Sequence, residues 1–363
     1  MTSSWTASLL RSRGDTHTVI PAIPAGSLRQ LVAGLHLWDF WPVYDAGGEV
    51  ATVDRRQLWM ALSAPDHLSR DQRHDRARIR LLSVTGTMWR DEGNLLPDGF
   101  SAGSREWSGC AFLNARTGSL TLYYTAAGER GETATTYRQR IFEAHGKLRP
   151  GTPIVTTDWT DHRECLEADG TWYRPATETK AAPGFMTAFR DPYIVADPAG
   201  GEEYMLFAGS SPREDERYNG VVGVARRAGS RWIPQPPLIS AVGVNMELER
   251  PHAIIFEGRY YLFWSTQSHT FHPRIDAPTG LYGMVASAMM GPYVPINGNG
   301  LVMRNPSEAP SQTYAWQVLN DLSVVSFADL LPGMPSAPPI FVGTIAPMMR
   351  LVLNGERATA QSL

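Results

Sequence analysis

The chain has 363 residues, with 33 basic and 36 acidic side chains, a formal net charge of −3 and 43% hydrophobic residues. These values allow a sizeable core and exclude wholesale disorder. The sequence has no basic run or stripe and no apolar stretch of roughly 18 residues, so neither a nucleic acid nor a membrane is expected as a partner. The content of 33 Gly, 27 Pro, 11 Trp and 13 Tyr indicates many short strands joined by loops.

The first 20 residues lack the basic segment and apolar run of a cleavable signal peptide. This leaves cytoplasmic residence, export by a route that the sequence does not reveal, or a trimmed chain. No Pro-, Gly- or Ser-rich linker divides the sequence. We therefore expect a single domain over residues 1–363, with residues 1–30 as an N-terminal arm that packs on it or extends from it.

Helical periodicity is scarce, and the better candidates are residues 26–34 and 136–148, both expected at the periphery. Strand patterns dominate, and they occupy residues 120–126, 203–210, 220–226, 253–265, 280–287 and 322–328. The run at 253–265 reads as two strands around Gly258 and Arg259, which predicts a hairpin. The pattern is all-β and allows either a sandwich or a propeller, whose five blades would have about 73 residues each.

Two aspartates lie in unusual sequence contexts. Asp39 is flanked by tryptophans in HLWDFWPVYD (36–45), and Asp191 follows Arg190 in FRDPYIVADP (189–198). Both segments suit plain turns. The alternative for Asp39 is a partly desolvated carboxylate in a sugar-sized slot, because aromatic faces pack against the C–H faces of sugars and burial raises the pKa of a carboxyl group.

Two glutamates alternate with a leucine in MELERPHAIIF (246–256), so that on a strand Glu247 and Glu249 share one face. When two carboxylates lie close together, the pKa of one of them rises unless a cation lies between them. Arg190 and Arg250 are the candidates for such a cation. A pair of exposed glutamates on an edge strand is the alternative.

No metal or cofactor is expected. The nine histidines show no H-x-H or H-E-x-x-H spacing, and the sequence has no G-x-S-x-G motif, P-loop or dinucleotide fingerprint. Cys110 and Cys165 cannot form a zinc site by themselves, and they form either one disulfide or two thiols. What remains, acidic residues among many aromatics, suits acetal chemistry with one carboxylate as nucleophile and one carboxyl as acid.

Taken together, these segments resemble family 68 of the glycoside hydrolases, the levansucrases and β-fructofuranosidases. The matches run in the family's order: LWDFWP (37–42), EWSGCA (106–111), FRDPYIVADP (189–198), ELERPH (247–252), YYLFW (260–264) and VVSFADL (324–330). The resemblance implies a five-bladed β-propeller with a central funnel-shaped active-site pocket that accepts sucrose. It also implies a secreted, extracellular enzyme, and cytoplasmic residence is the alternative.

The resemblance further implies roles for individual residues. Asp39 falls on the nucleophile that forms a covalent fructosyl-enzyme, Glu249 on the general acid/base, and Asp191 on the transition-state stabiliser. The implied substrate-binding residues are Trp38, Trp107, Ser108, Arg190, Glu247, Arg250, Gln267 and Tyr314.

Two positions depart from the family's pattern. An Arg or His that binds the acceptor usually follows the YYLFW strand, and an ungapped comparison places Gln267 there, with His269 two residues further on. Ala208 stands where the family commonly has a Glu, which we expect to brace that cation. We interpret the two changes as a rebuilt acceptor side that favours hydrolysis and short fructo-oligosaccharides.

The sequence therefore predicts a sucrose-acting retaining fructosyl enzyme that releases glucose and passes fructose to water or to short sugars. A levansucrase that makes high-mass levan is the alternative. A non-catalytic carbohydrate-binding propeller and a propeller glycosidase that acts on arabinosides or inulin are more remote ones. The expected partners are sucrose and fructo-oligosaccharides, and the oligomeric state is not predicted.

Overall fold

The structure, a computed structural model, describes residues 2–11, 17–24, 26–177, 186–212, 217–332 and 339–363. Strands dominate this part of the chain. Its helical elements are the short α-helix α1 (Ala7–Arg11) and three 3-10 turns, η1 (Gln72–Arg76), η2 (Ser268–Thr270) and η3 (Ile296–Gly298). None of its helices is long and apolar enough to cross a membrane.

Within the described residues the strands form antiparallel units of four main strands, here called blades I to V. Blade I has β3 (Leu35–Tyr44), β5 (Arg56–Pro65), β6 (Arg78–Thr85) and β7 (Met88–Asn94), with β4 (Thr52–Val53) beside β5. Blade II has β8 (Arg105–Asn114), β9 (Ser119–Ala127), β10 (Gln139–Arg149) and β11 (Val155–Leu166). Blade III has β12 (Phe189–Ala196), β13 (Glu203–Ser210), β14 (Gly220–Ala228) and β15 (Arg231–Ser240). Blade IV has β16 (Glu249–Phe256), β17 (Arg259–Thr266), β18 (Gly280–Ala286) and β20 (Leu301–Arg304), with β19 (Val294–Pro295) beside β18. Blade V has β21 (Thr313–Val318), β22 (Ser323–Leu331), β24 (Met349–Asn354) and β25 (Arg357–Ser362), with β23 (Ile340–Ile345) beside β22.

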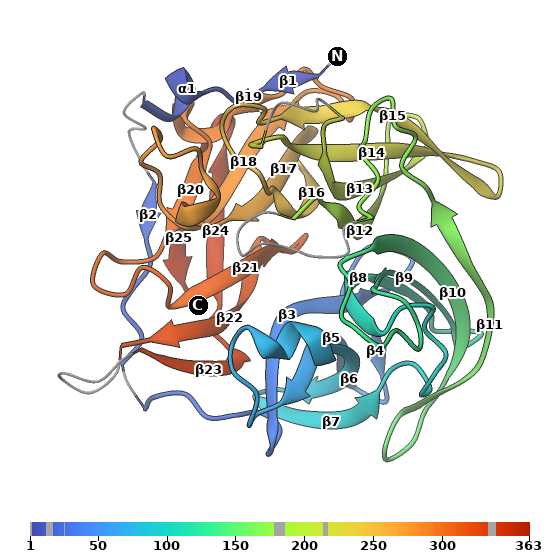
Figure 1. Ribbon diagram of the computed structural model, residues 1–363. Coiled ribbons are helices and arrows are strands. Elements are labelled where there is room, and N and C mark those ends of the chain that lie inside the picture. The colour runs from blue at the N-terminus through green and yellow to red at the C-terminus, as the bar shows by residue number, and fades with distance from the viewer. Residues whose placement is uncertain (1, 12–16, 25, 178–185, 213–216, 333–338) are drawn as a thin grey trace.

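The blades form a closed ring. Each first strand packs against the first strand of the next blade, in the order β3, β8, β12, β16, β21 and back to β3. Figure 1 shows these five strands converging on the centre, with the later strands of each blade further out. The first two blades also join into one sheet through the parallel pair β3–β8. The expected five-bladed β-propeller is confirmed.

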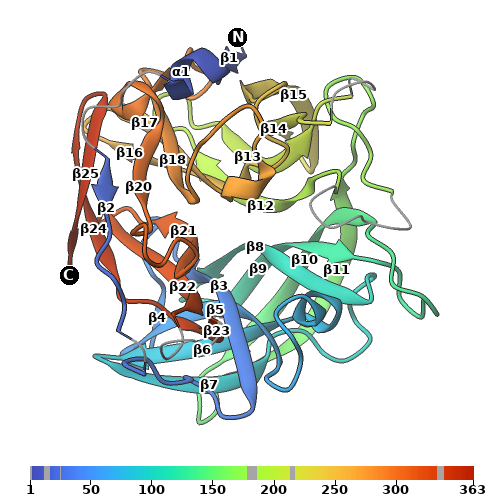
Figure 2. The same cartoon turned by 60° about the vertical axis from the view of Figure 1, so that its left-hand side comes forward.

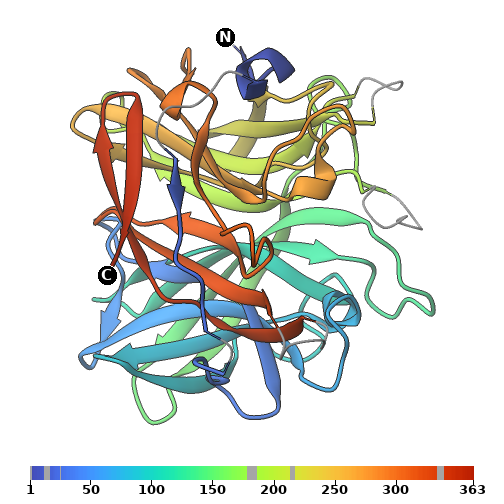
Figure 3. The ribbon, with the colours of Figure 1, turned by 90° about the vertical axis from the view of Figure 1, so that its left-hand side faces the viewer.

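The described part of the N-terminal arm packs on the outer edges of two blades. The short strand β1 (Ser3–Ser4) pairs in parallel with β15, and β2 (Thr18–Val19) pairs in parallel with β20. Figure 3 shows β2 running beside the C-terminal hairpin, where the N–H of Ala360 donates to Oγ1 of Thr18 at 2.7 Å. Trp5 is buried against Trp264, so the arm contributes to the core of blade IV.

The prediction of helices over residues 26–34 and 136–148 is wrong. Most of 136–148 is β10, which pairs with β9 on one side and β11 on the other, so backbone hydrogen bonding within a sheet outweighs its helix-forming composition. Residues 26–34 form turns and bends, and Gly26 and Gly34 have φ of 75° and 79°, which a right-handed helix does not accept.

The predicted strands are confirmed, and the hairpin over 253–265 is β16 and β17. Its turn lies one residue earlier than expected. Glu257 and Gly258 occupy the turn with φ of 48° and 72°, and Arg259 is already the first residue of β17. Two consecutive positive φ angles suit a two-residue hairpin turn whose twist matches that of the strands.

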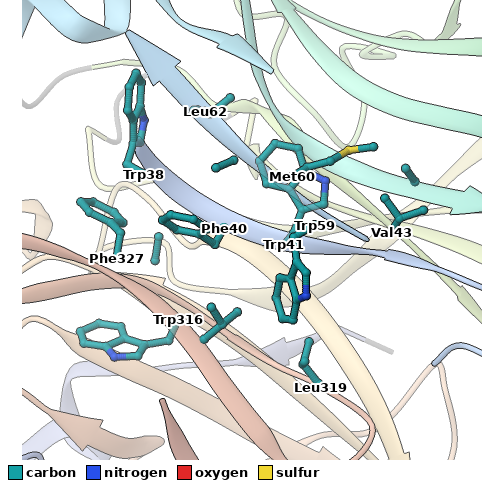
Figure 4. Close-up of a cluster of buried hydrophobic side chains, with 14 of the residues drawn as sticks. Trp38, Phe40, Trp41, Val43, Trp59, Met60, Leu62, Trp316, Leu319 and Phe327 are labelled. Atoms are coloured by element: carbon teal, nitrogen blue, oxygen red, sulfur yellow. The ribbon is translucent and has the colours of Figure 1, made fainter. Parts of the chain in front are cut away.

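Aromatic side chains close the ring between blades V and I. Figure 4 shows Trp38, Phe40 and Trp41 of β3 together with Trp316 and Phe327 of blade V. All five side chains are buried and belong to the largest apolar cluster of the described residues. The tryptophans on either side of Asp39 are thus core residues at the joint between the first and last blades, where large aromatic rings bury the most apolar area.

Candidate active site

A cavity of about 390 Å³ lies where the first strands of the blades converge. Residues from every blade line it: Asp39, Leu62, Asp71, His74, Asp75, Trp107, Ser108, Tyr137, Met186, Arg190, Asp191, Glu247, Glu249, Arg250, Gln267, His269, Tyr314 and Ala315. The predicted site residues are in this set, apart from Trp38. Segments that are far apart in the sequence therefore meet in one place.

Each first strand carries one extra residue, a β-bulge, near the cavity. The bulges follow the same plan around the ring, at the pairs Trp38–Asp39, Trp107–Ser108, Arg190–Asp191, Glu249–Arg250 and Tyr314–Ala315. In a regular strand two consecutive side chains point to opposite faces, whereas a bulge re-aims one of them. In four of these pairs both residues line the cavity, and in the first pair Asp39 does.

In four of these five pairs the second residue has an unusual backbone conformation. The φ angles of Asp39, Asp191, Arg250 and Ala315 are 52°, 60°, 51° and 55°. Residues other than glycine occupy this left-handed region at a cost of roughly 1 kcal/mol, and they do so mostly at functional sites. The fold therefore accepts local strain in order to aim these residues at the axis.

Asp39 is held by a neighbour from blade II. The hydroxyl of Ser108 donates to Oδ2 of Asp39 at 2.7 Å. Burial raises the pKa of Asp39, while the positive charge of Arg250 and the Ser108 hydrogen bond lower it. The net effect is a raised pKa, and Ser108 and Arg250 limit that rise and so favour the ionised form of Asp39.

Three carboxylates surround the guanidinium of Arg190. Nη2 donates to Oε1 of Glu249 at 3.0 Å and lies 3.4 Å from Oε2 of Glu247, and Nε lies 3.7 Å from Oδ2 of Asp191. Burial raises the pKa of Asp191 and of Glu247 to about 7, although Arg190 opposes the rise in both. Burial lowers the pKa of Arg190, but its acidic neighbours outweigh this effect and raise it overall. Burial thus favours the protonated forms of Asp191 and Glu247 more than in water, while Arg190 stays charged.

Glu249 has partners on both oxygens. Besides Arg190 on Oε1, the hydroxyl of Tyr314 donates to Oε2. Burial, followed by the charge of Glu249, keeps the pKa of Tyr314 well above its ordinary value, so the hydroxyl remains a donor. Glu247 lies ahead of β16, which begins at Glu249, so the two glutamates are not on one strand as the alternation suggested, yet both reach Arg190.

Arg250 links four blades. Its backbone N–H donates to Oδ2 of Asp191 at 3.2 Å, and Nη1 donates to the carbonyl of Ala315 at 3.0 Å. Nη2 donates to the carbonyl of Phe40 at 2.9 Å and to Oε1 of Gln317 at 2.8 Å. The side chain is buried, so these bonds satisfy a buried cation. The structure thus gives Arg250 a positioning role in addition to its place in the lining.

The two predicted tryptophans lie differently. Trp107 lines the cavity, and its indole N–H donates to the carbonyl of His74 at 3.3 Å. Trp38 is not part of the lining formed by the described residues. It lies one layer behind, with its ring 5.7 Å from that of His74 and 4.8 Å from the guanidinium carbon of Arg73. Trp38 supports the wall from the core side.

Several lining residues were not predicted. Asp71, His74 and Asp75 come from η1 and the residue before it, a polar connection between two strands of blade I, and Tyr137 and Met186 come from segments without a recognisable motif. Burial, and then the charges of nearby arginines, hold the pKa of His74 well below its ordinary value, so His74 is neutral. The only sequence signal for the η1 residues is that their segment is polar, and this does not distinguish them because polar loops are common.

Of the two positions in the acceptor-side interpretation, Gln267 lies in the cavity lining and the placement of Ala208 needs correction. His269 lines the cavity as well, so both an amide and an imidazole are within the lining. Ala208 is fully buried in β13, directly opposite Arg190 in the sheet register, and is not part of the described lining. A carboxylate at position 208 would face Arg190 across the strands rather than a cation at position 267.

Both cysteines are free thiols in the structure. Cys110 is buried, Cys165 is partly buried, and both pack in the apolar cluster between blades II and III. Burial raises the pKa of Cys110 to about 12, which makes it an unreactive core residue.

Comparisons with known proteins agree with this geometry. A family model described as Levansucrase/Invertase matches residues 2–225 and 215–363. The chain is 32% identical to levansucrase Lscbeta from Pseudomonas syringae pv. actinidiae, over 90% of this chain and 82% of that protein. It is also 32% identical to the levansucrase from Erwinia amylovora, over 98% of this chain and 93% of that protein.

Solved structures show the same architecture. An inulosucrase from Halalkalicoccus jeotgali bound to kestose superposes with a TM-score of 0.90 and 32% identity, over 100% of this chain and 96% of that one. The levansucrase from Gluconacetobacter diazotrophicus, at 22% identity, gives a TM-score of 0.85 over 99% of this chain and 90% of that one, and supports the fold alone.

Proposed function

The chain belongs to the levansucrase and invertase family, and from this premise we propose that it cleaves sucrose with retention and passes the fructosyl unit to water or to short sugar acceptors. The observation that carries the proposal is the meeting of Asp39, Asp191 and Glu249, from three blades, around the buried cations Arg190 and Arg250. This is the carboxylate set that a two-step glycosyl transfer needs.

In the first step, we assign Asp39 as the nucleophile. Its ionised form is favoured by Ser108 and Arg250, and it attacks the anomeric carbon of the fructosyl unit. A bond forms between the carboxylate and that carbon, while the bond to the glucosyl oxygen breaks. The product is a covalent fructosyl-enzyme.

Glu249 is assigned as the acid and then the base. As an acid it gives its proton to the departing glucosyl oxygen, and as a base it takes a proton from the incoming water or sugar hydroxyl. Tyr314 and Arg190 fix the two carboxyl oxygens, so that the orientation is set before substrate arrives.

Asp191 is assigned as the stabiliser of the transition state. Its Oδ2 already accepts the backbone N–H of Arg250, and its backbone N–H donates to Oγ1 of Thr125 at 3.0 Å. These bonds hold the carboxylate where it can accept hydrogen bonds from fructosyl hydroxyls. Such bonds strengthen as positive charge develops on the sugar ring.

The balance between hydrolysis and transfer is part of the proposal. Neutral hydrogen bonds from Gln267 hold an acceptor more weakly than charge-assisted ones, which favours water and short acceptors. His269 in the same lining favours the alternative, a levansucrase that builds high-mass levan, because its imidazole offers a second hydrogen-bonding group to an acceptor hydroxyl.

One experiment tests both statements. The protein is incubated with sucrose, and glucose, fructose, oligosaccharides and polymer are resolved over time. We expect glucose release, with free fructose and short fructo-oligosaccharides as the main further products. Abundant high-mass fructan at early times would establish the levansucrase alternative, and a protein that releases no glucose would refute the proposed function.

A further inference from the structure

A second cavity, of about 490 Å³, lies on the outer side of blade III and shares no lining residue with the central cavity. One of its walls is the loop with Thr171 and Trp172, and another is the N-terminal arm around β1. Strand β15 and the segment after β13 complete it. Figure 2 shows β1 and β15 together at the outer end of this blade, away from the centre of the ring. We call this cavity the Trp172 groove.

The chemical character of the groove is uniform. None of the described residues that line it has an ionisable side chain. The lining combines apolar surface with six hydroxyl groups, which come from Thr2, Ser4, Thr6, Thr171, Ser211 and Ser240. Within the described residues the Thr6 hydroxyl pairs with that of Ser8, and the other five have no hydrogen-bond partner in the protein. The described lining therefore suits a neutral ligand with many hydroxyl groups, because these residues offer no charge to pair with a charged ligand.

Trp172 provides an aromatic face in this groove. Its side chain is 42% exposed, whereas most tryptophans of the described chain are buried or nearly so. Burying a tryptophan gains more free energy than burying almost any other side chain, so leaving one in solvent forgoes stability. An exposed tryptophan that rims a groove is typical of a binding surface.

The loop is built to hold Trp172 in that position. Oδ1 of Asp169 accepts the backbone N–H groups of Thr171, Trp172 and Tyr173, at 3.0, 2.8 and 3.1 Å. The Tyr173 side chain is fully buried, and its hydroxyl donates to the carbonyl of Gln235 at 2.6 Å. The residue next to the exposed tryptophan thus anchors the loop to blade III, so that the indole is preorganised and a ligand need not order it.

From these observations we propose that the Trp172 groove is a second carbohydrate-binding site, which takes a neutral oligosaccharide chain with a sugar ring against the Trp172 indole and its hydroxyls on the flanking serine and threonine side chains. The lining by itself indicates a neutral sugar and does not specify which one. The choice of a fructan chain as that sugar rests on the proposed function, because fructans are what the central cavity would make or shorten.

Affinity electrophoresis in native gels tests the proposal. The gels contain inulin, levan or, as a glucan comparison, dextran, and the protein carries Asp39→Asn so that the polymer is not consumed. Retardation against polymer concentration gives an apparent Kd. We expect Trp172→Ala to raise the Kd for inulin or levan about tenfold, as for loss of one central aromatic contact. Trp172→Phe, which keeps an aromatic face, should restore most of the affinity.

Controls separate the groove from folding and from the central cavity. Met88→Ala removes another exposed apolar side chain, 73% exposed on β7, and should leave retardation unchanged. In the otherwise native enzyme, Trp172→Ala should keep kcat/KM for sucrose within about twofold, which shows that the fold and the central cavity are intact.

Two results would overturn the proposal: no retardation by any of the three polymers in the parent protein, or equal retardation of Trp172→Ala and its parent. Retardation by dextran alone would keep the site and change its sugar. Failure of the proposed function would be detected separately, because the native enzyme would then release no glucose from sucrose. The gel result for the Trp172 groove does not depend on that outcome.

Discussion

The backbone N–H of Arg250 donates to Oδ2 of Asp191 at 3.2 Å, although 59 residues separate them in the sequence. Both residues occupy the bulge of their strand with a positive φ. The bond thus joins the strained points of two neighbouring blades and holds a carboxylate whose pKa burial raises to about 7. The geometry of this contact links catalysis to stability, because a carboxylate kept in a buried cluster for its chemistry destabilises the fold when it is ionised.

The first prediction follows from that raised pKa. Between about pH 4 and pH 7 folded Asp191 holds a proton that the unfolded chain has lost, so wild-type stability falls as the pH rises through this window. Asp191→Asn removes this dependence and keeps an acceptor oxygen for Arg250. Its free energy of unfolding relative to wild type should therefore rise by on the order of 1–3 kcal/mol between pH 4 and pH 8.

Urea unfolding at several pH values measures this difference. Asp98→Asn is the control, because the Asp98 side chain is 91% exposed, and its stability should follow that of wild type across the range. If Asp191→Asn differs from wild type by the same amount at every pH, Asp191 does not carry a raised pKa in the folded state.

The second prediction concerns the acidic limb of activity. The kcat/KM profile should be bell-shaped, since Asp39 must be ionised and Glu249 protonated. Ser108→Ala removes a hydrogen bond that lowers the pKa of Asp39, so the acidic limb should move to higher pH. We also expect the maximum of kcat/KM to fall by about tenfold or more.

A matched serine serves as the control. Ser83 also donates to a buried carboxylate, Glu92, at 2.5 Å, but in blade I outside the central lining. Ser83→Ala should lower stability without moving the limb. An unshifted acidic limb in Ser108→Ala would show that this hydrogen bond does not control the ionisation of Asp39.

Glu249→Gln tests the acid/base. The amide can still accept from Tyr314, so the local structure should persist, but it cannot deliver a proton. Sucrose turnover should fall by on the order of a thousandfold or more, with an unfolding transition close to that of wild type. Turnover within about tenfold of wild type would place the general acid elsewhere.

The acceptor side yields a further prediction. Gln267→Arg introduces charge-assisted hydrogen bonds to an acceptor, and the ratio of transfer to hydrolysis should rise by about tenfold. Gln57→Arg, at an exposed position on β5, adds the same charge away from the cavity and should leave the ratio unchanged. Product analysis at equal sucrose conversion measures the ratio, and an unchanged ratio in Gln267→Arg would mean that residue 267 does not contact the acceptor.

The family resemblance predicted the fold, and it singled out three carboxylates that the structure places in one cavity, because these signals are local strings. Asp39, Asp191 and Glu249 each sit in a distinctive motif, and the motifs occur in a recognisable order. The sequence could not predict which side chains face the cavity, because this depends on the bulges. An extra residue breaks the alternation of faces, so that Trp38 goes to the core while the equivalent Trp107 faces the cavity.

Long-range contacts explain the other differences. The residues of η1 reach the cavity only because blade I is placed beside blade II, and a polar loop looks the same in the sequence whether or not it lines a site. Ala208 departs from the family's pattern and was therefore expected to affect the acceptor side, whereas its place opposite Arg190 in the sheet decides what it contacts.

The central claim is that Asp39 forms a covalent bond to the fructosyl unit. The enzyme is mixed with saturating sucrose, quenched in acid within one turnover time, digested and analysed by mass spectrometry. The account predicts an added fructosyl unit on the peptide that contains Asp39, and neither this adduct nor appreciable glucose release in Asp39→Asn. An adduct on a peptide with Asp191 or Glu249 instead, or undiminished glucose release by Asp39→Asn, would contradict it.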